Sequence, residues 1–464
     1  MNRVPALAGA PSRDATHTRR PRSFGKRPSK PSYPGGHVRV TTAFNKMLAI
    51  VGASVEGVTF TPEGIVVGLR RRRVKHRCPC GWKTWAIYDR SIRRWRHLDL
   101  GSARCFLEAE IARIDCARCG RVRTEEVPWA RPGARHTRDL QDVVAWLAQR
   151  TDKTTITKLL RVSWEAVAHI VAIVVADRLD EARLEGLLHI GVDEISYRQG
   201  HRYLTVVADH DRDGAVVWAG EGKNAAALHA FYDLLGTERC EQLEAVSLDM
   251  GAAYKSATDA KAPEARQCVD PFHVVKLANA AVDKSRRWAW NESRRRQRSE
   301  KGPLGRSRTM ATPEGWIKQT RWALLKDPDS LKDSQLAILH ALRRDNSVLY
   351  RAWQLKEGLR DLYRVRPADA PDHLRWWLTW ASRCRIPAFV ALAKTIRLNR
   401  ERILDAIELG LSNSKLEGLN SKIRLINHRG YGHHSAAAVI AMIYLCCGGI
   451  TIELPTYRVL PVAN

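Results

Sequence analysis

Several features are scarce in this chain of 464 residues, and each scarcity excludes a class of protein. Crossing a bilayer as a helix takes ~20 consecutive apolar residues. The apolar run near the C-terminus, Ala436–Ile450, spans only about 15 residues and is better explained as a buried helix. The basic N-terminus is not followed by an apolar core, so the sequence shows no secretory signal. We therefore expect a protein that is neither exported nor inserted into a membrane.

Acidic residues are also scarce, with 49 Asp and Glu against 77 Lys and Arg. The formal net charge is +28 and the isoelectric point is near 10.1. Such an excess predicts attraction to a polyanion, and nucleic acid is favoured over an anionic membrane. The chain is too long for one ordinary domain, and a hydrophobic content of 44% is enough for substantial cores.

The ten cysteines do not have the spacing of a small disulfide scaffold, so reduced thiols in the cytoplasm are the default. Two pairs lie in turns that end in glycine, and two such turns supply the four thiolates of a tetrahedral zinc site. We predict one structural Zn²⁺ in a β-rich domain over residues 41–130. One pair has the usual two-residue spacing and the other is one residue shorter. The candidate ligands are Cys78, Cys80, Cys116 and Cys119, with His76 as a possible substitute and Cys105 as a further candidate.

Two basic segments of the N-terminal part have both a functional and a simpler interpretation. Residues 1–40 contain nine Lys and Arg, one acid and many Pro, Gly and Ser, so we expect them to be disordered. They are either a solvated tail or a non-specific DNA-binding arm. Arg70–Arg77 places six basic residues in eight positions. On a zinc module this is a plausible phosphate-contact strip, whereas alone it is only a solvated face.

Residues 131–185 change to a helical period. Two short amphipathic helices are separated by a tight turn at Val162–Ser163, and Ser163 is a good N-cap for the second helix. The pattern fits a helix-turn-helix DNA-binding domain, although any helical hairpin has the same spacing. The candidate residues of this motif are Ser163, Trp164, Glu165 and His169.

Residues 186–275 are expected to fold in the order β-β-β-α-β-α-β, an antiparallel meander followed by right-handed crossovers. This is the arrangement of an RNase-H-like fold. The first strand is expected to end at Asp193 and Glu194, and the fourth at Asp249. Because these two strands are predicted to pair at the centre of the sheet, Asp193 and Asp249 become neighbours. Two adjacent carboxylates repel each other, and a divalent cation such as Mg²⁺ relieves that cost.

A two-metal site for phosphodiester cleavage needs a third carboxylate. Glu194 is expected to point to the opposite face of the sheet. Asp270, within a fifth strand predicted over Arg266–Val274, and Glu417 are the contenders. A rival interpretation of Glu417 is an S-x-x-E capping box that begins at Ser414. If the segment is helical, its apolar stripe (Leu416, Leu419, Ile423 and Ile426) docks on the sheet, and the neighbouring stripe carries Glu417, Asn420 and Arg424.

Together these stretches resemble the DDE transposases of bacterial insertion sequences, in particular the ISL3 family. The resemblance is carried by "GVDEISYRQGHRYLTVVADHD", "SLDMGAAY", "DPFHVVKLA" and "LSNSKLEGLNSKIRLINHRGYG", and extends from about Thr41 to the C-terminus. It implies an α+β multidomain chain: a zinc-binding segment, a helix-turn-helix and an RNase-H-like core split by a helical insertion. It implies that the catalytic acids, which bind two Mg²⁺ or Mn²⁺ ions, are Asp193, Asp249 and Glu417. Supporting or DNA-contacting roles fall on Asp270, His273, Asn420, Arg424 and Arg429.

The insertion is implied by the 168 residues that separate Asp249 from Glu417. Residues 276–411 read as almost wholly helical and hold eight of the fifteen tryptophans, and residues 412–464 would complete the core. Lys284–Gly302 interleaves basic residues with indoles, which predicts either DNA contact or helix packing with solvated arginines.

The resemblance implies a transposase that binds the terminal inverted repeats of an insertion sequence, cuts there and joins the freed 3′-OH to target DNA. It would act in the bacterial cytoplasm, at the nucleoid, as a homodimer or larger assembly on double-stranded DNA. The alternatives are a non-catalytic DNA-binding regulator built from the same modules and a nuclease for RNA–DNA hybrids. The sequence departs from the family in the tight Cys78-Pro-Cys80 spacing, in His433 where an aromatic residue is usual, and in the first 40 residues, which lie outside the resemblance.

Overall fold

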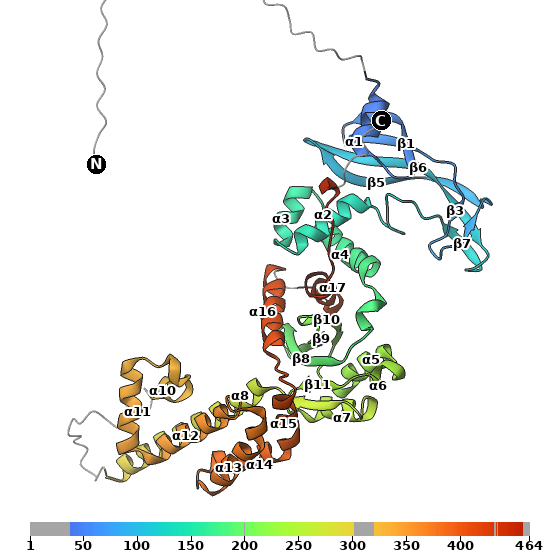
Figure 1. Cartoon of the computed structure of the whole chain (residues 1–464). Helices are drawn as coiled ribbons and strands as arrows, with labels where there is room; N and C mark the ends of the chain where they lie inside the picture. Colours follow the sequence, from blue (N-terminus) through green and yellow to red (C-terminus); the bar gives the residue numbers. More distant parts are fainter. Residues whose placement is uncertain (1–37, 199, 301–319, 431–432, 434, 458–464) are drawn as a thin grey trace, which may run out of the picture.

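The protein is an elongated succession of modules, with a β-rich module at one end and a helical arm at the other (Figure 1). No single helix among the described residues is both long and apolar enough to cross a membrane; only α3 and α4, taken together as a sharply bent pair, pass on length and composition. The expected N-terminal tail lies outside the described residues apart from its last three positions. The computed structural model describes residues 38–198, 200–300, 320–430, 433 and 435–457.

The β-rich module is built on a sheet in the order β1-β2-β6-β5, with β7 paired to the far end of β6. Its core includes Trp95, which meets Trp129 edge to face with ring centroids 5.8 Å apart. The predicted β-rich character is confirmed, and β5 and β6 form a long hairpin of 12 and 14 residues. The elements are α1 (Val40–Leu48), β1 (Ala53–Thr61), β2 (Gly64–Arg71), β3 (His76–Arg77), β4 (Lys83–Thr84), β5 (Asp89–Leu100), β6 (Ala103–Cys116) and β7 (Arg121–Thr124).

Three helices follow, and the last two have the geometry of a helix-turn-helix. The chain turns by 102° between them, through Arg161 in the left-handed region at φ 53°. The Ser163 hydroxyl accepts a hydrogen bond from the backbone N–H of Ala166 at 3.2 Å, which confirms Ser163 as the N-cap of the second helix. The helices are α2 (Arg138–Ala148), α3 (Lys153–Leu160) and α4 (Trp164–Arg178).

The central sheet has five strands in the order β10-β9-β8-β11-β12. The first three strands are antiparallel neighbours, and β11 and β12 run parallel to β8. The predicted order of strands and helices is confirmed, with one additional short helix, α6. The elements are β8 (His189–Arg198), β9 (Arg202–Asp209), β10 (Ala215–Glu221), α5 (Ala225–Leu235), α6 (Thr237–Glu241), β11 (Ala245–Leu248), α7 (Ala252–Lys261) and β12 (Arg266–Val269).

Two strand boundaries were predicted wrongly. The strand that carries Asp193 does not end there but continues to Arg198, because its alternating residues Ile195 and Tyr197 still bury their side chains. The fifth strand stops at Val269 rather than continuing to Val274. Pro271 has no N–H for a further ladder bond and instead begins α8 (Pro271–Glu300), a position that suits proline.

Each face of the central sheet has its own apolar core. One face packs against α5 and α7. The other packs against α4, α16 (Ser414–Arg429) and α17 (Ala436–Cys447), in a single cluster that also includes the apolar faces of α2 and α3. The predicted apolar stripe of α16 is confirmed as buried. The helix-turn-helix is therefore not packed as a separate domain, because it shares an apolar core with the central sheet.

The segment between β12 and α16 forms the helical arm. Its apolar core includes Trp377, which is fully buried and donates its indole N–H to the Leu355 carbonyl at 2.8 Å. Trp288, Trp322 and Trp376 are exposed, whereas Trp316 lies outside the described residues. Besides α8, the helices are α10 (Arg321–Leu325), α11 (Asp333–Asp345), α12 (Ser347–Asp361), α13 (Ala370–Arg383), α14 (Pro387–Leu398) and α15 (Arg400–Glu408).

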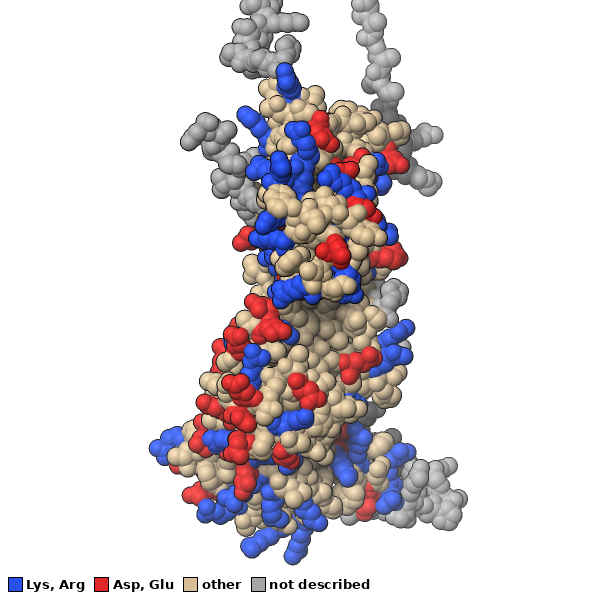
Figure 2. Space-filling view, turned by 90° about the vertical axis from the view of Figure 1, so that its right-hand side faces the viewer, with Lys and Arg blue, Asp and Glu red and all other residues tan. Residues whose placement is uncertain are grey.

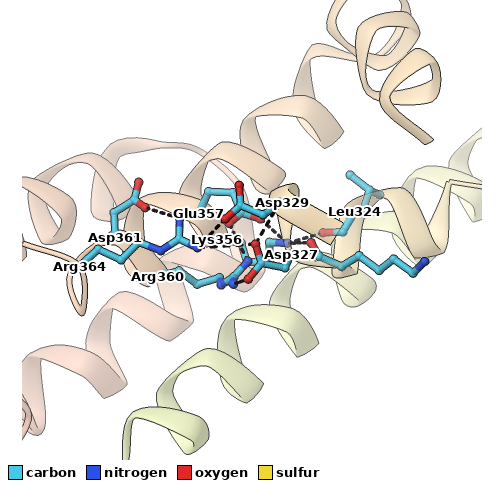
Figure 3. A network of polar contacts seen from close by, with 9 residues as sticks. Leu324, Asp327, Asp329, Lys356, Glu357, Arg360, Asp361 and Arg364 are labelled. Atoms are coloured by element: carbon cyan, nitrogen blue, oxygen red, sulfur yellow. Dashed lines mark hydrogen bonds and ion pairs between the residues drawn. The ribbon is translucent and has the colours of Figure 1, made fainter. Parts of the chain in front are cut away.

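A buried charge network ties α10 to α12 (Figure 3). The Lys356 ammonium is completely buried and donates to the carbonyls of Leu324 at 2.7 Å and Lys326 at 3.1 Å, at the end of α10. It also pairs with Glu357, which is paired in turn with Arg360. Burial lowers the pKa of Lys356, so the charged form depends on these partners.

Replacing Lys356 with methionine should destabilise the helical arm by about 3–5 kcal/mol, because the Glu357 carboxylate and two carbonyls lose their buried partner. Urea denaturation measures this change. The control is Arg366→Ala, which removes an ion pair whose arginine is 83% exposed and should cost less than about 1 kcal/mol. Equal effects of the two substitutions would contradict the assignment.

Candidate active site and DNA-binding modules

Asp193 and Asp249 are brought together by the register of two parallel strands. Ser247 on β11 pairs with Gly191 on β8. Asp249, directly after the end of β11, and Asp193 each lie two residues beyond this pair, at the same edge of the sheet. Both carboxylates contribute to raising the pKa of His273, after the larger effect of Asp270, so both lie near this imidazole. The predicted proximity of the two acids therefore follows from the observed sheet.

Asp193 is held in a defined orientation. Its Oδ1 accepts the backbone N–H of Glu194 at 2.7 Å, and its Oδ2 accepts the side-chain amide of Asn420, on α16, at 2.6 Å. Burial raises the pKa of Asp193, and these two hydrogen bonds only partly offset that effect. A half-buried carboxylate whose charge is under-compensated is well suited to a cation.

Glu194 lies on the other face of the sheet, as strand alternation predicts. Its neighbour Val192 packs in the core against α5 and α7, and residues two apart on a strand share a face. Its cross-strand partner is Thr205, whose hydroxyl lies 2.9 Å from the Tyr254 hydroxyl on α7. Glu194 is thus directed away from α16.

Asp270 is buried and already has several partners. One carboxylate oxygen accepts the backbone N–H groups of Phe272 at 3.3 Å and Asn413 at 3.2 Å. The other lies 3.3 Å from His273 Nδ1, in ion-pair range. Asp270, together with Asp193 and Asp249, raises the pKa of His273 against the opposing effect of burial. Asp270 thus joins the start of α8 to the start of α16.

Glu417 is exposed on the first turn of α16, one turn before Asn420. α16 starts at Ser414 with Asn413 as its N-cap residue, so Ser414 is not at the N-cap position that the rival capping box requires, and Glu417 lies one position too far along. The ligand atoms of Glu417, Asp193 and Asp249 do not form a compact set that could bind one metal ion in this structure. Among the described residues, the only group of three or more potential ligands within 4.8 Å of one another is a cysteine cluster.

The remaining predicted residues of α16 lie further along the helix. Arg424 is exposed, two turns beyond Glu417. Arg429 is half-buried and lines a small apolar cavity between α16 and the helix-turn-helix, together with His433. Of the segment around His433, Tyr431, Gly432 and His434 lie outside the described residues.

Sequence reasoning missed Arg402, on α15 of the helical arm. Its guanidinium donates to the backbone carbonyl of Asp249 at 3.2 Å, and burial lowers its pKa. Arg402 and Asp249 are 153 positions apart, so no local pattern links them. The arm thus contributes a cation directly behind one of the paired acids.

The four predicted cysteines converge between the β3–β4 ribbon and the β6–β7 turn. Cys78 Sγ lies 3.9 Å from Cys119 Sγ, and Cys80 Sγ lies 3.5 Å from Cys116 Sγ. Sulfurs bound tetrahedrally to one zinc ion at about 2.3 Å lie about 3.8 Å apart, so the donor set fits zinc. Burial raises the pKa of Cys78 to about 12, whereas a backbone N–H at Trp82 lowers that of Cys80 to about 6.

The two other candidates for zinc binding have different surroundings. His76 Nδ1 lies 2.7 Å from Glu125 and 2.6 Å from Arg71, so this imidazole is already engaged away from the sulfurs. Cys105 is buried in the apolar core of the β-rich sheet. The shorter spacing of Cys78 and Cys80 is accommodated without a substitute ligand.

The second helix of the helix-turn-helix has a buried and an exposed side. Val167, Ile170, Val171 and Val174 are buried. Glu165 and His169 are exposed, and Trp164 is half-exposed beneath the Lys153 ammonium, 4.5 Å from the ring centroid. The exposed side is available for contact with DNA.

Comparison with known proteins agrees with this geometry. A family model described as "Transposase" matches residues 190–443, and one described as "Helix-turn-helix domain of transposase family ISL3" matches residues 125–172. The chain is 43% identical over 399 residues to the transposase for insertion sequence element IS1557 of Mycobacterium tuberculosis, covering 83% of this chain and 88% of the relative. It is 28% identical over 365 residues to the transposase for insertion sequence element IS1001 of Bordetella parapertussis, covering 76% and 84%.

Replacing Cys116 with serine should remove most of the bound zinc and lower the melting temperature, because a structural zinc site contributes directly to folding. Zinc content of the purified protein, measured by atomic absorption, checks this. Cys105→Ala is the matched control, since Cys105 is buried in the same module outside the cluster. Wild-type zinc content in the Cys116 variant would contradict the assignment.

Proposed function

Because the chain belongs to the ISL3 family of insertion-sequence transposases, we propose that it binds the terminal inverted repeats of an insertion sequence and catalyses metal-dependent cleavage and strand transfer of DNA. The observation that carries the proposal is the pairing of Ser247 with Gly191, two residues before Asp249 and Asp193 respectively, with α16 bonded to Asp193 through Asn420. The same helix carries Glu417 one turn away.

We infer that the central sheet is an RNase-H-like core. The inference is supported by the order β10-β9-β8-β11-β12 and by the change from antiparallel to parallel pairing at β8. The helical arm enters the chain after β12 and leaves before α16, as an insertion would. On this proposal, residues 186–275 and 412–464 form one catalytic domain.

Asp193, Asp249 and Glu417 are the proposed ligands of two Mg²⁺ or Mn²⁺ ions. Such ions, when bound, activate a water nucleophile and stabilise the leaving oxygen. The under-compensated charge of half-buried Asp193 supports a cation at this point. Asn420 would hold one Asp193 oxygen in place, and Asp270, occupied by hydrogen bonds, would support the site without binding metal.

The proposed chemistry is two in-line displacements at phosphorus. In the first, a water oxygen bonds to the phosphorus at the element end, and the P–O3′ bond breaks to release a 3′-OH. In the second, that hydroxyl oxygen bonds to a target phosphorus, and the target's own P–O3′ bond breaks, so the number of phosphodiesters is conserved. The exposed Arg424 guanidinium, on the same helix as Glu417, would contact a DNA phosphate.

We propose that the N-terminal modules make the contacts that recognise DNA. The exposed side of α4, with Glu165 and His169, would enter the major groove. Figure 2 shows Lys and Arg gathered over the β-rich module, whereas the sheet domain below carries more Asp and Glu on the same face. A groove of that module is lined by Arg70–Arg73, Trp85 and Arg90 together with Glu56, Glu110 and Glu125, and its excess of arginine over glutamate suits the phosphate backbone.

Two further parts of the chain have proposed roles on DNA. In the helical arm, the Arg294 guanidinium stacks on the Trp290 ring, 5.1 Å from its centroid, and would offer a phosphate contact beside an aromatic surface. Joining two element ends requires two sites, so a dimer or larger assembly on DNA is proposed, acting in the bacterial cytoplasm. Residues 1–40 are proposed as a non-specific arm.

Asp193→Asn should reduce cleavage of an end-containing duplex by on the order of 10³-fold, because the amide cannot hold a metal ion as a carboxylate does. Binding of the same duplex, measured by mobility shift in Ca²⁺, should be unchanged. Asp211→Asn, at the hairpin of the same sheet, is the control for loss of a carboxylate and should cut normally. A cutting Asp193→Asn variant would refute the assignment of this acid.

Glu417→Gln should also abolish nearly all cleavage while leaving end binding intact, because the amide removes the charge of the third carboxylate. The measurement is single-turnover cleavage in Mg²⁺ and in Mn²⁺. Should both acids tolerate substitution and the wild-type protein bind ends without cutting, the non-catalytic DNA-binding regulator becomes the better description.

A further inference from the structure

A chain of buried hydrogen bonds connects the central sheet with the start of α16. His210 Nε2 lies 2.8 Å from Ser247 Oγ, and the Ser247 hydroxyl donates to Asn413 Oδ1. The three residues are 8%, 0% and 3% exposed, so water does not compete for these bonds. Ser247 and Asn413 are 166 positions apart, and their contact joins β11 to the N-cap of α16.

The backbone of Asn413 makes a second hydrogen bond, to another element. Its N–H donates to Asp270 Oδ1 at 3.2 Å, and the same carboxylate accepts the N–H of Phe272 at the start of α8. Asn413 is therefore tied to β11 by its side chain and to the β12–α8 junction by its main chain. Two anchors on separate elements leave α16 little freedom to slide or rotate at its start.

The side chain of Asn413 is used in an unusual way for its position. Asparagine is among the best N-cap residues because its oxygen accepts a backbone N–H of the first turn. Asn413 makes no such cap bond, whereas the N-cap side chains of α2, α3, α4, α5 and α17 all do. The Asn413 oxygen that would stabilise its own helix is committed to Ser247 instead.

The packing around Gly191, next to these hydrogen bonds, is too tight for a side chain. A Cβ atom on Gly191 would lie 2.7 Å from the Leu416 side chain and 2.8 Å from His210 Nε2, too close for either to stay in place. Gly191 pairs with Ser247 across the strands, and both residues lie two positions before a paired acid. Leu416, in the first turn of α16, is thus in close contact with Gly191 on β8, two residues before Asp193.

We propose that Ser247 and Asn413 are positioning residues that set the place of Glu417 relative to Asp193 and Asp249. The Asn413 carbonyl accepts the backbone N–H of Glu417 at 2.8 Å, so the anchored residue and the acid belong to one helical turn. Ser247 touches neither substrate nor metal in this scheme and acts through the helix. The inference rests on the proposed function, in which Glu417 is the third metal ligand.

The experiment is Ser247→Ala in the full-length protein, with an end-containing duplex as substrate. Misplacement of one catalytic group by about 1 Å lowers rates on the order of 100-fold, so cleavage should slow by between about 10- and 100-fold. The Mg²⁺ concentration for half-maximal cleavage should rise severalfold, because a displaced Glu417 binds the ion less well. The dissociation constant for the duplex in Ca²⁺ should not change.

Thr258→Val is the matched control. Thr258 is a fully buried hydroxyl of the same domain, bonded to the Tyr254 carbonyl and to the Tyr232 hydroxyl on the other side of the sheet. Its loss should lower the melting temperature without moving the Mg²⁺ dependence. Ser247→Cys, whose thiol is a weak donor in a similar volume, serves if Ser247→Ala does not fold, and should shift the Mg²⁺ dependence to a smaller extent.

The outcomes distinguish a failure of the positioning role from a failure of the proposed function. If the wild type cleaves, Glu417→Gln does not, and the Ser247 variant matches the wild type in rate and Mg²⁺ dependence, the positioning role alone is overturned. If Thr258→Val shifts the Mg²⁺ dependence equally, the effect is general destabilisation and the role is likewise overturned. If the wild type shows no metal-dependent cleavage, or Glu417→Gln retains it, the proposed function fails and this inference fails with it.

Discussion

The packing of α16 into one apolar core is the constraint on which the rest of the structure depends. Leu416, Leu419, Ile423 and Ile426 are buried against the sheet and against the helix-turn-helix, and each such side chain contributes roughly 1.5–3 kcal/mol on burial. The same helix then has two ends with different neighbours. Asn420 in its second turn contacts Asp193, and its last turns line a cavity with the helices of the helix-turn-helix. Since cores are close-packed, neither end can shift without disturbing the other.

The acidic residues near this helix differ in how fully their carboxylates are hydrogen-bonded and paired. Asp270 lies at the end of its strand like Asp249, but its oxygens are occupied by Phe272, Asn413 and His273. Such a carboxylate is structural, because its charge is already compensated. Asp193 is half-buried with two neutral donors, and the pKa of Asp193 is raised. The hydrogen bonds thus distinguish Asp270, which joins elements of the fold, from Asp193, which is proposed to bind a cation.

Patterns of short range predicted much of this fold, and contacts of long range account for what was missed. Strand alternation and the placement of Asp193 and Asp249 indicated the central sheet, and the two cysteine pairs indicated the cluster. The end of β8 was misplaced because a charged pair inside a strand looks like its terminus, although Ile195 and Tyr197 continue the alternation. The capping box at Ser414 has a valid local signature, but Asn413 takes the N-cap position instead. Arg402 behind Asp249 and Ser247 beneath Asn413 carry no signal at all, since their partners lie 153 and 166 positions away.

The wide separation of β11 and α16 along the chain also has a consequence for synthesis. Chains are made from the N-terminus, and domains acquire structure as their residues emerge. The cysteine cluster and the helix-turn-helix are made early, but the core beneath those helices is completed only by α16 and α17, which follow the helical arm in the chain. The anchor at Asn413 is made at the same late moment. A chain synthesised only as far as the helical arm therefore contains Asp193 and Asp249 but neither the finished core nor Glu417, so the proposed catalytic acids can come together only after the arm has been made.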